Sequence, residues 1–265
     1  MKKLCLTAAI LMTAAASMAQ DHLPPVFGAD TALFRKDIMT RSYMTPKKIL
    51  WTSSATAVQN AELLLKPNTG QADIFGEGMC RLTNNGNDQA SLILDFGHEL
   101  HGGFKLVISS CSPLQTPQVR LRFGESVSET CTELNTTKSI AETGSKADVN
   151  LKANTATNDH AIRDMVLTVP FYGQMEVGST GYRFVRIDLL TPGQTINLKE
   201  ATAILRYRDI PYVGSFRCSD QRLNDIWMTG AYTVHLNMQE YIWDGVKRDR
   251  LVWLGDMHPE TTTIS

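Results

Sequence analysis

The sequence predicts a mainly β protein, an antiparallel β-sandwich followed by a long helix. Six short segments between residues 45 and 208 are rich in β-branched and aromatic residues, and Gly, Pro and Asn turns separate them. No helical pattern of comparable length lies between these segments, which favours an antiparallel sandwich over a parallel sheet. After Ser219 the apolar residues recur every three or four positions, so a helix is predicted to follow the strands.

The composition is that of an ordinary globular protein and excludes several classes. The 265 residues include 26 Lys and Arg against 27 Asp and Glu, and 43% are hydrophobic. These values exclude disordered and collagen-like chains. The balanced charge offers no basic surface for a phosphate backbone or an anionic membrane, so we expect no nucleic-acid partner.

The first 19 residues have the pattern of a secretory signal peptide. Lys2 and Lys3 precede an apolar run, residues 4–16, that is short for a membrane span, and small residues at 17–19 end it. A buried apolar helix is the alternative, but it would not explain the two lysines or the cleavage-like end. No later stretch is long and apolar enough to span a bilayer. We therefore expect an exported product, periplasmic or extracellular, without a membrane span.

Four cysteines remain in the mature chain. An oxidising compartment permits disulfides, and four cysteines allow three pairings between which the sequence does not choose. Because no pair has the close spacing of a zinc site, we expect structural cysteines, either buried or disulfide-bonded, and no metal. They are Cys80, Cys111, Cys131 and Cys218.

The predicted strands are short and spaced by turns. In residues 119–123 and 184–189, apolar and charged residues alternate with a period of two, which predicts half-buried strands with one wet face. Residues 126–160 are polar with few apolar anchors, so we expect a long surface loop there. The six predicted strands are 91–96, 104–108, 118–123, 164–169, 183–190 and 203–207.

A helix is predicted to begin at Ser219. Ser219 supplies an N-cap hydroxyl, and Asp220 places a carboxylate in the first turn, against the positive end of the helix dipole. An apolar stripe then predicts about twenty helical residues, ending near Trp243, and we interpret that stripe as the face that packs on a core. The stripe consists of Leu223, Trp227, Ala231, Val234, Met238 and Tyr241.

Residues 244–256 form the most chemically dense stretch of the chain. They include three carboxylates, three cations and one tryptophan. Carboxylates between cations and apolar residues can have their pKa values pushed apart, as acid catalysis requires. Carboxylates that bind hydroxyls beside an indole ring are also typical of a sugar site. The alternative is a connecting loop tied by salt bridges, and chemistry alone leaves both interpretations open.

Two runs near the C-terminal end, 214–227 and 244–256, closely resemble the start of the catalytic domain of bacterial α-L-rhamnosidases, a family of inverting glycoside hydrolases. Upstream, residues 94–103, 121–126 and 181–186 are similar to the β-sandwich segments that precede that domain. The resemblance covers most of the mature chain.

The resemblance implies three regions. Residues 1–19 are the signal peptide, 20–212 the β-sandwich domain, and 213–265 the start of an (α/α)₆ catalytic barrel. Nine residues follow Asp256, whereas twelve helices of average length need more than about 130 residues. We therefore expect a truncated barrel that lacks the general base, and no rhamnoside turnover by the 265 residues on their own.

The resemblance also implies roles for five residues of the loop. Asp249 falls at the position of the family's general acid, which is a glutamate. Asp244 and Asp256 fall at sugar-binding aspartates, and Trp253 and Arg248 complete the predicted substrate-binding set. Since Asp249 is one methylene shorter than glutamate, its reach to the glycosidic oxygen differs, and a relative acting on another sugar or an inactive relative stays open.

Three functions follow from these observations. The first is a glycoside hydrolase that releases terminal rhamnose from glycans with inversion, with no cofactor and a rhamnose-containing glycan as its partner. The second is a secreted, non-catalytic, carbohydrate-binding β-sandwich. The third is a secreted structural or adhesion module.

Overall fold

A computed structural model describes residues 26, 37–73, 78–131, 164–247 and 250–264. The chain divides into two compact units, residues 1–37 and 38–265, and the sheet and long helices described below belong to the second unit. The predicted signal peptide, residues 1–19, lies outside the described residues.

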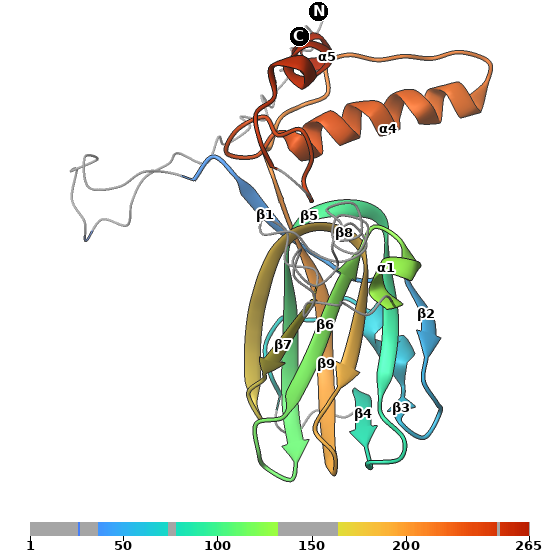
Figure 1. Ribbon diagram of the computed structural model, residues 1–265, viewed down its shortest axis with the longest axis vertical. Helices are drawn as coiled ribbons and strands as arrows, with labels where there is room; N and C mark the ends of the chain where they lie inside the picture. The colour runs from blue at the N-terminus through green and yellow to red at the C-terminus, as the bar shows by residue number, and fades with distance from the viewer. Residues whose placement is uncertain (1–25, 27–36, 74–77, 132–163, 248–249, 265) are drawn as a thin grey trace, which may run out of the picture. The chain divides into compact units, whose positions relative to one another are not determined.

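In the described part of the chain, nine strands form one antiparallel sheet (Figure 1). The order of the main path is β3-β4-β9-β5-β8-β6-β7, while β1 pairs with β9 and β2 pairs with β5. The strands are β1 (Thr40–Met44), β2 (Lys48–Thr52), β3 (Val58–Gln59), β4 (Cys80–Asn84), β5 (Ser91–Ser112), β6 (Gln118–Gly124), β7 (Asp164–Thr168), β8 (Gly173–Leu189) and β9 (Gln194–Tyr207).

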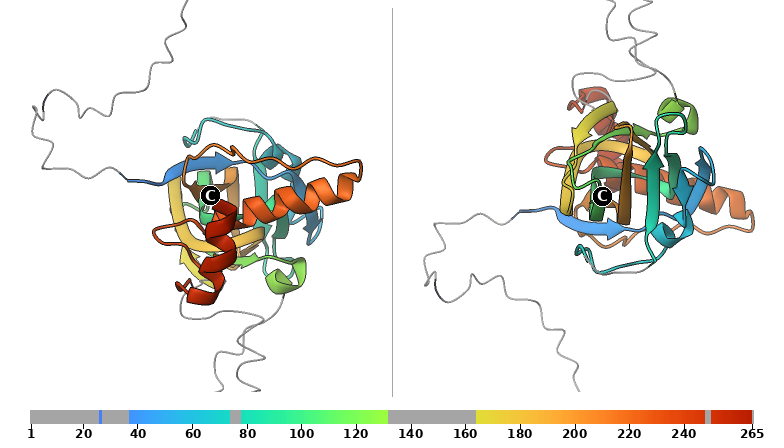
Figure 2. Two further views of the ribbon diagram at one scale, coloured as in Figure 1. Left: turned by 90° about the horizontal axis from the view of Figure 1, so that it is seen from above. Right: turned by 90° about the horizontal axis from the view of Figure 1, so that it is seen from below.

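The sheet becomes a sandwich because its longest strands change partners along their length. Residues 92–95 of β5 pair with β2, whereas residues 102–112 pair with β9, and β8 accompanies β5 through both halves. The register of β5 against β8 shifts between Asp95 and Leu100 and again between Gly102 and Phe104, where the strand bends. Seen from above, the strands surround a common interior (Figure 2). The predicted mainly β, antiparallel sandwich is therefore confirmed.

The core is built from both halves of these long strands. Leu92, Phe104, Val185 and Ala203 all belong to one buried apolar cluster. Tyr182 lies at its centre, fully buried, and its hydroxyl donates to the carbonyl of Gly103 at 2.5 Å. The polar end of this ring is thus satisfied without water.

One detail of the predicted strands is wrong. The strands predicted at 91–96 and 104–108 are a single strand, β5, because residues 100–102 between them resume the pairing with β8 after a register shift. Of the predicted surface loop, residues 127–131 form a short helix, α1 (Val127–Cys131), and residues 132–160 lie outside the described part of the chain.

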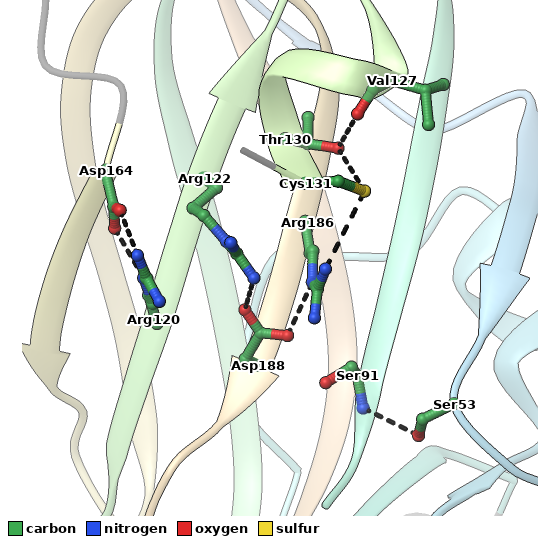
Figure 3. A network of polar contacts seen from close by, with 10 residues as sticks. All are labelled: Ser53, Ser91, Arg120, Arg122, Val127, Thr130, Cys131, Asp164, Arg186 and Asp188. Carbon is green, nitrogen blue, oxygen red and sulfur yellow. Dashed lines mark hydrogen bonds and ion pairs between the residues drawn. The ribbon is translucent and has the colours of Figure 1, made fainter. Parts of the chain in front are cut away.

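The wet face predicted for β6 and β8 is also incomplete, because an ion-pair network is buried there (Figure 3). Arg122 and Asp188 are both under 5% exposed, and a guanidinium nitrogen of Arg122 lies 2.9 Å from the Asp188 carboxylate. Arg186 donates to the second carboxylate oxygen at 2.8 Å. Pairing lets these charges leave water, so alternation of charged and apolar residues did not identify an exposed face.

The helix predicted from Ser219 is present as α4 (Gln221–Asn237), and α5 (Leu254–Ile264) follows it. The predicted N-cap, Ser219, is wrong by one residue: the N-cap is Asp220, whose carboxylate accepts a hydrogen bond from the amide of Arg222 at 2.9 Å. The helix ends at Asn237, earlier than Trp243. A 3₁₀ helix, η3 (Ala61–Leu65), lies beside the sheet. None of the helices in the described ranges is long and apolar enough to cross a membrane.

The interpretation of the apolar stripe of α4 as a core face is wrong for the described residues. Leu223 is 48% exposed and Tyr241, which lies beyond the helix, is 69% exposed. Leu236 and Asn237, at the C-terminal end of the helix, are the buried residues of α4. The reason is that the described elements pack against only this end of α4.

The four cysteines are free thiols. Cys80 and Cys111 are buried in the sandwich, where burial raises the pKa of Cys80 to about 12 and that of Cys111 to about 11. Both behave as small apolar residues of the core, which matches the buried alternative. Cys131 is exposed and Cys218 is partly exposed.

Candidate functional site

A cleft of about 1090 Å³ lies where one end of the sandwich meets α4. Residues 96–100 of β5 line one wall, and Met228, Tyr232 and Leu236 of α4 line another. The loop between α4 and α5 closes the cleft with residues 244–247. Two parts of the chain that are remote in sequence, β5 and the segment formed by α4 and its following loop, therefore meet at one opening, which is typical of a binding site.

The loop that lines this cleft is closed by its own hydrogen bonds. The amide of Asp244 donates to the carbonyl of Leu251, and the amide of Leu251 donates to the Asp244 carboxylate, both at 2.9 Å. The amide of Trp243 donates to the carbonyl of Asn237 at 3.0 Å, which ties the loop to the end of α4. Asp244 is thus held at the cleft by the backbone of its own loop.

Two of the predicted site residues, the proposed acid Asp249 and its neighbour Arg248, lie outside the described residues. Two others, Trp253 and Asp256, are exposed and do not line the cleft. Trp253 is 51% exposed, and Asp256 lies in the first turn of α5.

A buried carboxyl group of α5 is affected by the charges of Asp244 and Asp256. Glu260 of α5 is only 7% exposed, and burial together with the charges of Asp256 and Asp244 raises its pKa. Two of the predicted sugar-binding aspartates therefore lie near enough to this carboxyl group for their charges to raise its pKa. Sequence reasoning missed Glu260, because it falls beyond the dense stretch in a segment with no other signal.

A second carboxyl group that sequence reasoning missed belongs to the sandwich. Glu99 lines the cleft, and burial and a hydrogen bond with Glu125 raise its pKa to about 8, although Lys247 acts in the opposite direction. The raised pKa favours a proton shared between Glu99 and Glu125 at neutral pH, because two ionised carboxylates in hydrogen-bond contact would repel each other. The resemblance had singled out segments 94–103 and 121–126, but only as sandwich pieces.

Lys247 brings the loop to these carboxyl groups. Its side chain is 4% exposed, and its ammonium lies 3.2 Å from a carboxylate oxygen of Glu125 and in contact with Glu129 of α1. The hydroxyl of Tyr232 donates to the carbonyl of Glu99 at 2.5 Å, so α4 is attached to the same segment of β5.

This arrangement suits a polar ligand that is rich in hydroxyls. It combines a neutral acid, several carboxylates and a buried cation at one opening, which is the pattern of groups whose pKa values are pushed apart. In the described residues no three His, Cys, Asp or Glu side chains are placed to hold a metal ion.

Comparisons with known proteins point the same way as the sequence motifs. Residues 211–265 match the family model of the bacterial α-L-rhamnosidase 6 hairpin glycosidase domain. The fold resembles a rhamnosidase from Klebsiella oxytoca with rhamnose bound, at 19% identity and a TM-score of 0.57, over 84% of this chain and 40% of that chain. It also resembles a GH78 family rhamnosidase of Bacillus sp. GL1, at 18% identity and a TM-score of 0.51, over 78% of this chain and 18% of that chain.

The predicted resemblance to bacterial α-L-rhamnosidases is thereby confirmed, by a sequence match at the C-terminal end and by the fold over most of the chain. The chain spans less than half the length of either solved rhamnosidase. No curated protein matches it.

Proposed function

We propose that this chain carries the rhamnose-binding and proton-donating loop of an inverting α-L-rhamnosidase. The observation that carries the proposal is the position of Asp244, held at the cleft in a loop that lies within the family match, residues 211–265. The Klebsiella oxytoca rhamnosidase that shares the fold was solved with rhamnose bound.

In this proposal some residues of the loop bind the sugar and another residue protonates the leaving group. Asp244 and Asp256 accept hydrogen bonds from sugar hydroxyls, and Trp253 and Arg248 support the ring. Asp249 gives a proton to the leaving oxygen, a role that raises rates by roughly 10²- to 10⁴-fold in general acid catalysis. An inverting reaction further needs a carboxylate on the opposite face of the ring to activate water. We also propose that the protein is exported, in line with residues 1–19.

The test is L-rhamnose binding by the 265-residue chain, measured by isothermal titration calorimetry with L-fucose as the comparison sugar. The Asp244→Asn variant should lose at least about tenfold in affinity, because a charged hydrogen-bond acceptor for hydroxyls is lost. The Asp249→Asn variant should bind like the wild type, because free rhamnose has no leaving group to protonate. Asp88→Asn, whose carboxylate binds Ser54 and Thr56 on the sandwich, is the matched control.

Each outcome decides between functions. Binding that depends on Asp244 supports the rhamnosidase proposal. Binding that all three variants retain favours the alternative, a non-catalytic carbohydrate-binding sandwich. Absence of any rhamnose binding by the wild type contradicts the rhamnosidase proposal, and absence of binding to either sugar favours the structural or adhesion module.

A further inference from the structure

Three segments of the sandwich converge on two residues of the cleft loop, Val246 and Lys247. Glu99 lies in the first segment, Glu125 in the second and Gly181 in the third, and these are the segments 94–103, 121–126 and 181–186 that the sequence motifs singled out. Since the proposed hydrolytic residues all lie elsewhere, catalysis alone does not explain why these side chains meet there.

The first contact is a close approach of backbone to side chain. A β-carbon added at Gly181 would lie 2.5 Å from Cγ2 of Val246 and 3.3 Å from Cβ of Lys247. Val246 is 6% exposed, so its side chain has little room to move away. The absence of a side chain at position 181 therefore allows Val246 and Lys247 to pack directly against the backbone of β8.

The second contact is a buried charge cluster. The Lys247 ammonium has carboxylate partners from two places on the sandwich, Glu125 after β6 and Glu129 of α1. Burial makes each partner costly to remove, because the ammonium would keep its desolvation cost with less compensation. Glu99 is hydrogen-bonded to Glu125, so a third carboxyl group belongs to this cluster.

The third contact holds the other end of the loop. The Arg250 guanidinium donates to the carbonyl of Ser179 in β8 and, at 3.1 Å, to the carbonyl of Val246. It also stacks over the Trp243 ring, with 5.4 Å to the ring centroid. His101 packs against the same ring in a T-shaped arrangement, with 5.3 Å between the ring centroids. Burial lowers the pKa of His101 to about 3, so this imidazole is neutral.

We propose that Gly181, Glu125 and Glu129, at the end of the sandwich that we call the seat, are positioning residues that hold residues 243–247 and 250–251 of the cleft loop in place. The sandwich contacts the loop at two points, because Lys247 pairs with Glu125 and Glu129 and Arg250 donates to the carbonyl of Ser179. An effect of the seat on rhamnose binding rests on the proposed function, whereas an effect of the seat on the opening of the loop does not.

The experiment is hydrogen–deuterium exchange of the peptide covering residues 243–251 in the full chain, without sugar. Gly181→Ala and Glu129→Gln should each speed its exchange by about tenfold, because the loop opens more often. Gly214→Ala is the control for the first variant, since nothing lies within 4 Å of its added β-carbon. Glu176→Gln is the control for the second, since its ion pair with Arg41 is exposed and remote from the loop.

A size exchange separates positioning from general damage to the fold. Val246→Ala removes the atom that a side chain at 181 would strike, so the double variant Gly181→Ala/Val246→Ala should exchange closer to the wild-type rate than Gly181→Ala alone. Wild-type exchange at 243–251 in both Gly181→Ala and Glu129→Gln would overturn the seat. If the variants behave as expected but wild-type protein never binds L-rhamnose, the seat stands and the proposed function fails.

Discussion

Glu99 shows how the fold sets the charge of a single residue. Its carboxyl group is exposed to the same cleft as Asp244, yet burial and the neighbouring Glu125 raise its pKa to about 8, well above the ordinary value near 4.3. The folded state therefore binds a proton that the unfolded chain has released between these two pH values. The free energy of unfolding accordingly falls as the pH rises through this interval and levels off above about pH 8.

This gives a prediction for Glu99→Gln, which mimics the neutral acid at every pH. The free energy of unfolding of the wild type should fall between about pH 6 and about pH 9. Over the same interval that of the variant should fall by about 1 kcal/mol less, or by a larger difference. Urea unfolding at several pH values measures this difference. Glu62→Gln, on the exposed side of η3, should follow the wild type, and equal pH slopes for Glu99→Gln and wild type would show that Glu99 is ionised at neutral pH.

At the scale of single elements, β5 depends on a glycine at its bend. Gly102 has a φ of 148°, and an added β-carbon would lie 1.9 Å from the carbonyl oxygen of Ile204 in β9. Gly173, at the start of β8, has a φ of 125° but open space around it. The two positions share an unusual backbone conformation and differ in the room available.

We therefore predict different losses of stability when each of these glycines is replaced by alanine. Gly102→Ala should lower the free energy of unfolding by about 3 kcal/mol or more, because it forces β5 away from β9. Gly173→Ala should cost only the backbone strain, about 1 kcal/mol. Chemical denaturation of both variants tests this, and similar losses would mean that β9 yields easily at Ile204.

The elements also show where sequence patterns stop being informative. Alternating apolar residues and turn signals located the strands and the start of α4, because local periodicity reflects which face is buried. The same patterns divided β5 at Gly97 and Gly102, although both glycines serve the bend of a continuous strand. They also placed Arg122 and Asp188 on a wet face, because periodicity does not reveal that two charges on neighbouring strands neutralise each other.

At the scale of the whole molecule, the site draws on residues that are far apart in the chain. Asp244 could be predicted to lie at the cleft, because it belongs to one short stretch whose motif resembles the rhamnosidases, whereas sugar binding by Asp244 and Asp256 stays a prediction. Glu99 and Glu129 could not be predicted, because their place at the cleft depends on β5, the short helix α1 and the loop after α4 meeting at one end of the sandwich. The spacing of these residues in the sequence does not indicate that the elements lie together in the fold.

The central claim is that the sandwich holds a loop which binds rhamnose at the cleft. Its most direct test is the exchange rate of residues 243–251 measured with and without saturating L-rhamnose, in wild-type protein and in Asp244→Asn. We predict that rhamnose slows exchange in this segment of the wild type by about tenfold or more, because a bound ligand must leave before the loop opens, and that Asp244→Asn loses the protection. Unchanged exchange of 243–251 in wild-type protein that has rhamnose bound would contradict the claim and place the sugar elsewhere on the molecule.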